Sequence, residues 1–174
     1  MRENGIGDLQ FSAFFSPKKP TPSGWTWGVG PVLELPTATN DALGQGKWGL
    51  GPAMVALHIE KGSPWLYGAL INNVWSVGGD SERRAVNQML FQPFVNYNFP
   101  DHPGRYLTFS PLVTANWNAK GEQWTVPLGL GIGRLFRIGT TPVNVQAHAY
   151  YNVVKPEPLG KWTVRLQFQL LFPK

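Results

Sequence analysis

The sequence predicts an all-β protein with one domain over residues 1–174, an antiparallel up-and-down transmembrane β-barrel. Three observations predict this fold. Apolar and polar residues alternate along many segments, which is the pattern of a strand with one apolar face. Each segment has about 10 to 13 residues, enough for a tilted strand to cross a bilayer. The connections alternate between longer and shorter, as in bacterial transmembrane barrels.

Composition agrees with a fold of strands and turns. The chain contains 20 Gly and 16 Pro, and neither residue suits the interior of a helix. Only 14% of the residues are charged. There is no run of about 18 apolar residues, so a membrane-spanning helix is not expected.

The alternation is clearest near the C-terminus. From Val143 to Asn152 the odd positions are apolar or aromatic, and the even positions are Asn, Gln, His or Tyr. The segment from Trp162 to Phe172 has the same pattern, which only Leu171 interrupts. Since successive side chains of a strand point to opposite faces, each segment has one apolar and one polar face.

Seven further segments complete an expected set of nine strands. They are residues 9–16, 25–34, 47–60, 64–77, 88–99, 107–117 and 124–133. The segments 47–60 and 64–77 are apolar on both sides, so the sequence does not assign their faces.

Proline and glycine stand at unusual places in these strands. Each proline removes a ladder hydrogen bond, so we expect local bulges at the five prolines inside predicted strands. They are Pro31, Pro52, Pro93, Pro111 and Pro127. Glycine recurs at every second position in 28–30, 49–51 and 129–133, and two explanations are open. Either a loop, ligand or plug approaches the wall closely, or glycine relieves strain in a strongly coiled sheet.

The connections form two groups that would lie at opposite ends. Counted back from a periplasmic C-terminus, the external ones are 37–46, 79–86, 118–121 and 154–160, and the periplasmic ones are 17–24, 61–63, 100–104 and 138–141. External loops are usually the longer ones, and this order holds except at 118–121 and 17–24.

Tryptophan lies near the expected strand ends. We expect membrane-interface aromatic residues at the external end (Trp48, Trp75, Trp117, Trp124, Trp162) and at the periplasmic end (Trp25, Trp27, Trp65). An indole ring favours the boundary between lipid and water. The alternative is that these rings pack the core of a soluble protein.

The polar faces predict a polar lumen. We expect it to be lined by Glu34, Gln92, Asn96, Thr114, Asn144, Gln146, His148, Arg165 and Gln167. Arg134 falls on the apolar face, so it is expected near the periplasmic rim, where an arginine costs little. Because Arg165 and His148 face a single acid, Glu34, an open lumen is expected to prefer anions mildly.

Motifs of catalysis and of metal or nucleic-acid binding are missing. The chain has no Cys, and its three histidines, His58, His102 and His148, are not at metal-ligand spacings. The basic residues behind the net charge of +5 are scattered through turns, unlike those of a nucleic-acid-binding surface. His148 beside Tyr150 and Asn152 could belong to a hydrolase site, but no nucleophile accompanies it. We therefore expect no enzyme, no cofactor and no metal.

Ordered blocks along nearly the whole chain carry a family resemblance. They are Gly5-Ile6-Gly7-Asp8, Phe15-Ser16-Pro17, Trp27-Gly28-Val29-Gly30-Pro31, Leu35-Pro36-Thr37-Ala38-Thr39, Gly46-Lys47-Trp48, Asn87-Gln88, Gln92-Pro93-Phe94, Trp124-Thr125-Val126-Pro127 and Leu171-Phe172-Pro173-Lys174. They resemble a proteobacterial outer-membrane β-barrel family labelled as transporters or as proteins of the MetA pathway of phenol degradation. The resemblance implies an outer-membrane location and a channel role, and with it contact with outer-membrane lipid and insertion by the outer-membrane assembly machinery.

Members of that family carry a signal peptide and further strands before the Gly-Ile-Gly-Asp block. Residues 1–5 hold no apolar signal sequence. Nine strands is an odd number, whereas bacterial single-chain barrels are normally even. We therefore expect this chain to be the C-terminal part of a larger barrel.

Three functions fit the pattern. The leading hypothesis is a passive channel or transporter for small solutes, with aromatic or hydrophobic ones as candidates. The second is a structural outer-membrane barrel with a filled interior. The third is a soluble lipocalin-like barrel, whose apolar faces would point inward around a ligand.

Overall fold

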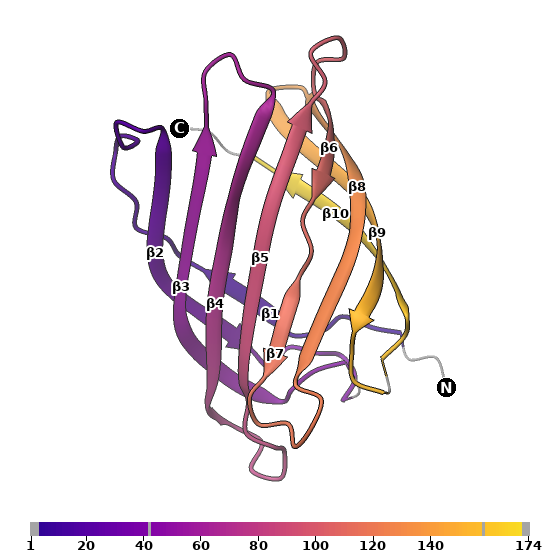
Figure 1. The fold of residues 1–174 in the computed structure, drawn as a ribbon. Coiled ribbons are helices and arrows are strands. Elements are labelled where there is room, and N and C mark those ends of the chain that lie inside the picture. The colour runs from indigo at the N-terminus through magenta and orange to yellow at the C-terminus, as the bar shows by residue number, and fades with distance from the viewer. Residues whose placement is uncertain (1–3, 42, 158, 172–174) are drawn as a thin grey trace.

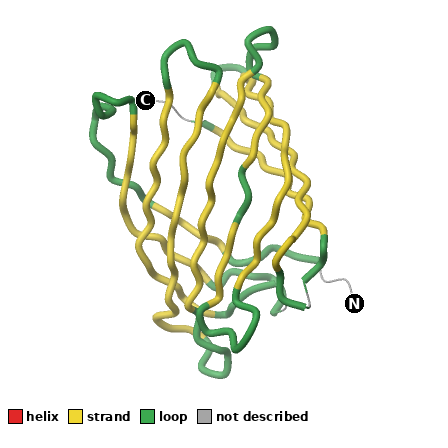
Figure 2. Tube along the Cα trace, viewed as in Figure 1, coloured by secondary structure: helices red, strands yellow, loops and turns green. Residues whose placement is uncertain are grey.

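The computed structural model describes residues 4–41, 43–157 and 159–171, and these residues form an all-β protein without a helix (Figures 1 and 2). Within that part of the chain, accordingly, no helix is long and apolar enough to cross a membrane. The expected alternation at Phe172 lies outside the described residues.

Ten antiparallel strands form one sheet. They are β1 (Leu9–Ser12), β2 (Trp25–Leu35), β3 (Lys47–Ile59), β4 (Trp65–Gly79), β5 (Asn87–Asn98), β6 (Arg105–Phe109), β7 (Val113–Asn116), β8 (Trp124–Ile138), β9 (Thr141–Val154) and β10 (Trp162–Leu170). Neighbours in sequence pair as hairpins, except that β6 and β7 share one place in the sheet, between β5 and β8.

The sheet is strongly curled, so that β1 and β10 pass behind the middle strands in Figure 1. Two contacts establish the curl independently of the view. Gln10 of β1 and Gln88 of β5 line the same cavity, and Arg165 of β10 reaches Ser110 at the end of β6. The described residues of β1 and β10 do not pair with each other, so both strands present a free edge.

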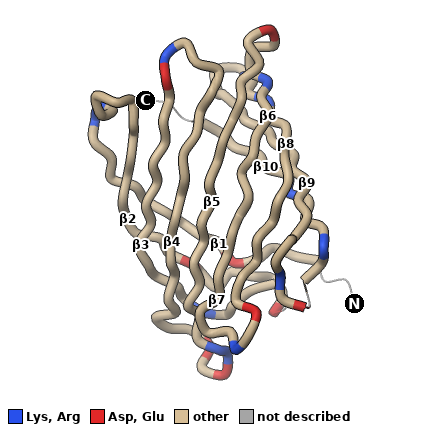
Figure 3. Tube along the Cα trace, in the orientation of Figure 1, with Lys and Arg blue, Asp and Glu red and all other residues tan. Residues whose placement is uncertain are grey.

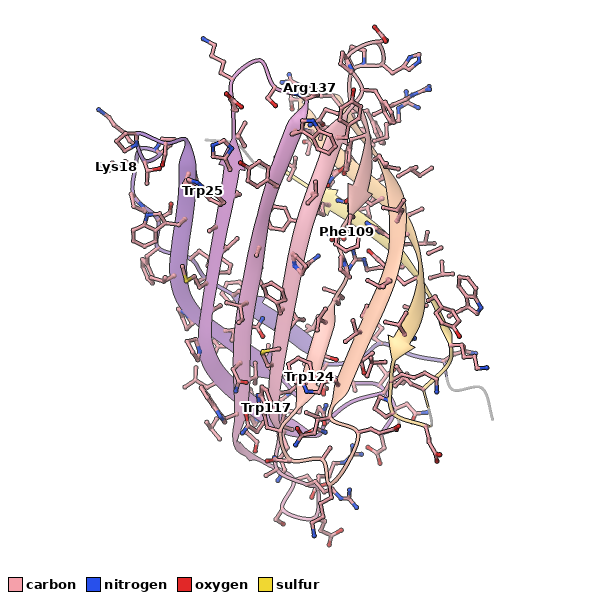
Figure 4. The ribbon with its side chains drawn as sticks, in the orientation of Figure 1. Lys18, Trp25, Phe109, Trp117, Trp124 and Arg137 are labelled. Atoms are coloured by element: carbon pink, nitrogen blue, oxygen red, sulfur yellow. The ribbon has the colours of Figure 1, made fainter. Side chains whose placement is uncertain are left out.

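The two faces of the sheet differ in chemistry. Along β9, Val145, Ala149 and Tyr151 are exposed on the convex face, while His148 and Tyr150 are buried on the concave face. The side chains drawn in Figure 4 show the apolar groups projecting from the outside of the wall. Alternation in the sequence therefore predicted the faces of this strand correctly.

The structure also assigns the faces of β3 and β4, which the sequence left open. Their outer faces carry the exposed side chains of Trp48, Leu50, Met54, Ile71 and Trp75. Their inner faces carry buried Gly49, Ala53, Asn72 and Val74. Small residues on the inner face of β3 leave room for inner side chains of β4.

The predicted strand 107–117 is two strands, which is why the sheet has ten strands and not nine. Pro111 lacks an N–H group for the ladder. The hydroxyl and carbonyl oxygens of Ser110 both accept hydrogen bonds from Arg165 on the inner face. As a result, residues 92–94 of β5 pair with neither β6 nor β7, and the wall is interrupted at this level.

Only one of the five strand prolines lies at a bulge, between Val126 and Pro127. The expectation of bulges is wrong for Pro31 and Pro52, which face each other without a register shift. Neither residue has an N–H, so they fit a pair that exchanges no hydrogen bonds. Pro93 likewise pairs in register, with Ala69.

The alternating glycines are explained by close packing within the wall. A Cβ atom at Gly129 would collide with the carbonyl oxygen of Ala149 on the next strand. One at Gly131 would collide with the ring of His148. These contacts favour the second explanation, space for a strongly coiled sheet, and at Gly131 the space also accommodates an inner side chain.

The connections lie at two ends of the sheet, grouped as the sequence predicted. The described residues of 36–46, 80–86, 117–123 and 155–161 lie at one end, called the 36–46 end below, and 17–24, 60–64, 99–104 and 139–140 lie at the other. The predicted strand 9–16 is shorter than expected, since β1 ends at Ser12 and residues 13–16 run beside the middle of β2 with a single bridge between Phe15 and Val29. Figure 3 shows that most Lys, Arg, Asp and Glu residues lie near these two ends. Arg134 is exposed in the last part of β8, toward the 60–64 end of the sheet, and pairs with Arg105 of β6.

Candidate functional site

All nine side chains expected to line a lumen lie on the inner face, because strand register and alternation place each of them on the same face as buried His148 or as Gln10 and Leu90. Strand register brings several of them into one row. Asn96, Thr108, Gly131, His148 and Arg165 are successive cross-strand partners from β5 to β10. The row crosses the concave face of the sheet and ends at Arg165, the one arginine among the nine residues expected to line a lumen.

Arg165 is the centre of a hydrogen-bond network on this face. Its Nη2 atom donates to the carbonyl oxygen of Ser110 at 2.8 Å, to the Ser110 hydroxyl at 3.0 Å and to the Tyr150 hydroxyl at 3.0 Å. Tyr150 donates to the same Ser110 carbonyl, and Gln92 donates to the Ser110 hydroxyl, each at 2.8 Å. The network joins β10, β9 and β5 to the break between β6 and β7.

Every acceptor of Arg165 is neutral, so its charge has no acidic counterpart among its hydrogen-bond partners. His148 belongs to this group, because its Nε2 atom lies 3.3 Å from Arg165 Nη2. Arginine can only donate, so His148 Nε2 must accept and the ring is neutral in this geometry. His148 is also only 2% exposed. With His148 neutral, Arg165 carries the positive charge of this network.

His148 has no nucleophile to activate within the described residues. Its Nε2 atom faces Arg165, and its Nδ1 atom has no hydrogen-bond partner. The nearby Ser110 hydroxyl is held by Arg165 and Gln92 instead.

A second network fastens β9 to its neighbours. Tyr106 of β6 donates to Asn144 at 2.6 Å, and Asn144 donates to Gln169 of β10 at 2.9 Å. Asn152 donates to the hydroxyl of Thr163 at 3.0 Å. Tyr106, Ser110 and Tyr150 were not among the predicted lining residues. Alternation places both Tyr150 and Ser110 on the polar face, but no local signal shows that Ser110 accepts hydrogen bonds from Arg165.

A separate cavity of about 320 Å³ lies on the inner face near the 36–46 end. It is lined by Asp8, Gln10, Glu34, Leu43, Gln45, Asn72, Val74, Gln88 and Leu90. Of the predicted lining residues, only Glu34 is part of it. The other eight residues belong to strands β5 to β10 and are not part of this cavity.

The two carboxylates of the cavity differ in their surroundings. Asp8 accepts hydrogen bonds from the backbone N–H groups of Ala38 and Gln45, so it fixes the connection 36–46. Glu34 is half-buried and forms no hydrogen bond or ion pair with any described residue.

Arg83 closes the same end from outside. Its Nη2 atom forms an ion pair with Asp41 at 2.8 Å, and Nη1 donates to the carbonyl oxygens of Asp41 and Gly44. The connection 80–86 therefore holds the connection 36–46 in place next to the cavity.

The eight tryptophans lie in the two predicted bands. Trp48, Trp75, Trp117, Trp124 and Trp162 are near the 36–46 end, and Trp25, Trp27 and Trp65 are near the other. All are exposed except Trp25, which is half-buried against His58 and Tyr67. Figure 4 labels Trp25, Trp117 and Trp124 at these two levels.

An outer-face polar group accompanies Trp117. The indole N–H donates to Asn73 at 2.8 Å, and Asn73 donates to Asn87 at 2.9 Å. The structure places Asn73 on the outer face of β4, whose faces the sequence did not assign, and its amide is satisfied by these neighbours.

The described residues contain no group of three or more His, Cys, Asp or Glu side chains that could hold a metal ion. Comparison with known proteins adds no relative: no family model, no curated protein and no solved structure matches this chain.

Proposed function

We propose that this chain forms the wall of an outer-membrane β-barrel that admits small polar solutes to its interior. The observation that carries the proposal is the contrast between the faces of the sheet. Large apolar side chains such as Leu130, Leu166 and Phe168 are exposed on the outside. An exposed apolar surface of this extent is unusual for a soluble monomer, and contact with lipid would cover it.

The two tryptophan bands support the same proposal. They bound the apolar surface at both strand ends, where a bilayer would have its interfaces. The lipocalin-like alternative needs apolar side chains that point inward, and this sheet has the opposite arrangement.

The inner face favours polar solutes over hydrophobic ones. Carboxamide, hydroxyl and charged groups predominate on β9 and β10, where Gln146, Gln167 and Gln169 line the concave face. The family resemblance suggests aromatic solutes, but a lining of this kind offers mainly hydrogen bonds. The role we propose is selection by size and lining charge, without a chemical step.

The filled structural barrel is the second candidate, because the Arg165 network extends over the inner face from β10 to Ser110 and occupies space there. Conductance separates the two candidates. The purified full chain is inserted into planar lipid bilayers, and stepwise current increments are expected for a channel.

A matched pair of variants tests whether the current runs along the inner face. Gln146→Trp adds a large ring to that face and should lower the conductance, whereas Val145→Trp adds the same ring outside and should leave it unchanged. Absence of current from correctly inserted wild-type protein would favour the filled barrel. Equal effects of both variants would show that the current does not follow the concave face.

A further inference from the structure

The cavity at the 36–46 end has the composition of a binding site for a cation. Its lining combines two carboxylates, Asp8 and Glu34, with four carboxamides from different segments, and none of the described lining residues is Lys or Arg. A volume of about 320 Å³ is at the lower end of the range of small-molecule sites.

Glu34 is the group that a ligand would satisfy. It lies on the inner face of β2 between Gln10 and Gly49, its cross-strand partners. Its carboxylate is half-buried without a hydrogen bond or ion pair to any described residue. A carboxylate withdrawn from water is costly unless a donor or a cation compensates it. Gly49 has no side chain, and the space beside it is occupied by Val74, which lines the cavity next to Glu34.

Asn72 is a second, independent sign of a ligand. The residue lines the cavity and is only 5% exposed, and its amide makes no hydrogen bond with the described residues, so the amide faces the open space of the cavity. An amide in this position takes its partner from water or from a ligand. Leu90 and Ala53, its neighbours across the strands, are apolar and cannot supply one.

We propose that this cavity binds a small organic cation, with Glu34 opposite an ammonium group and the amide of Asn72 bonded to the remainder of the solute. This inference rests on the proposed function and names its solute class. Asp8 contributes negative charge and also fixes the connection 36–46 above the cavity.

The test uses three probes with the same four-carbon chain: 1,4-diaminobutane, 1,4-butanediol and succinate. Binding to the purified full chain in detergent is measured by isothermal titration calorimetry. We expect the diamine to bind once per chain, the diol to bind more weakly and succinate not to bind. Glu34→Gln removes one charge without changing shape, and should weaken diamine binding by about tenfold or more, as expected for a charge-assisted hydrogen bond.

Glu60→Gln is the matched control, because it makes the same chemical change in the connection 60–64 at the opposite end. It should leave the affinity unchanged. Asn72→Leu removes an amide but no charge, and should weaken diamine binding roughly threefold to tenfold.

The proposal is overturned if the wild-type chain does not bind the diamine, if succinate binds as tightly, or if Glu34→Gln and Glu60→Gln behave alike. Circular dichroism verifies that each variant is folded. Binding in micelles requires neither membrane insertion nor a conducting pore. A chain that binds the diamine but carries no current therefore refutes the channel alone, and the reverse result refutes the cation site alone.

Discussion

At the scale of single residues, the inner face carries buried polar groups of two kinds. Asn144 and Asn152 are bonded to neighbouring strands and fasten them together. Asn72 has no such partner and lies in the cavity. A group that costs stability and serves no internal contact is typical of a binding site.

Replacing Asn72 should therefore stabilise the protein. Asn72→Leu keeps a similar size and removes an unsatisfied amide, so we expect the free energy of unfolding to rise by about 1 kcal/mol. Chemical denaturation in detergent micelles measures this change. Asn152→Leu is the control, and it should lower stability because it removes the bonds to Gly160 and Thr163. A loss of stability in both variants would mean that Asn72 has a structural role.

At the scale of strands, the sequence predicted the sheet well and its interruption poorly. Alternation along 143–152 and 162–170 identified β9, β10 and their inner faces correctly, because this signal is local. Pro111 marks this segment as irregular within the local sequence, but the contact that accompanies the break after β6, from Arg165 to Ser110, joins residues 55 positions apart in the chain. No local pattern contains a contact of that kind.

The outer face of β10 provides a test of the proposal that this surface faces lipid. Leu166 is 79% exposed, whereas its neighbour Gln167 lies on the inner face. Leu166→Arg should prevent assembly in lipid, with a cost of about 2 to 4 kcal/mol if the site is near the bilayer midplane. Gln167→Arg should assemble. Folding yield in lipid vesicles, measured by gel mobility with and without heating, distinguishes them, and equal yields would contradict a lipid-facing Leu166.

The clamp formed by Arg83 predicts a change confined to one end of the sheet. Arg83→Ala removes the ion pair with Asp41 and the bonds to the connection 36–46. A protease site inserted in that connection should then be cut faster than in the parent protein. Arg84→Ala removes the adjacent positive charge, which forms no hydrogen bond or ion pair with the described residues, and should leave the rate unchanged. Similar acceleration in both variants would mean that net charge, and not the clamp, controls the loop.

At the scale of the whole molecule, the curl of the sheet divides the inner face into two levels of opposite charge. Glu34 lies in the cavity near the 36–46 end, and Arg165 lies in the network around Ser110. The sequence predicted that both residues face inward. It did not predict their separation, because β1 and β5 meet across the cavity only after the sheet has curled.

The two charges should have opposite effects on ion selectivity. Arg165 has only neutral hydrogen-bond acceptors, so its field attracts anions at the level of Ser110, and a mild anion preference is expected for the wild-type chain. Arg165→Gln should shift the reversal potential toward cations, and Glu34→Gln should shift it toward anions. Both are measured in planar bilayers under a salt gradient, with Glu60→Gln as a control for charge outside the interior. If Arg165→Gln and Glu34→Gln shift the potential in the same direction, or neither shifts it, ions do not pass along the concave face that these residues occupy.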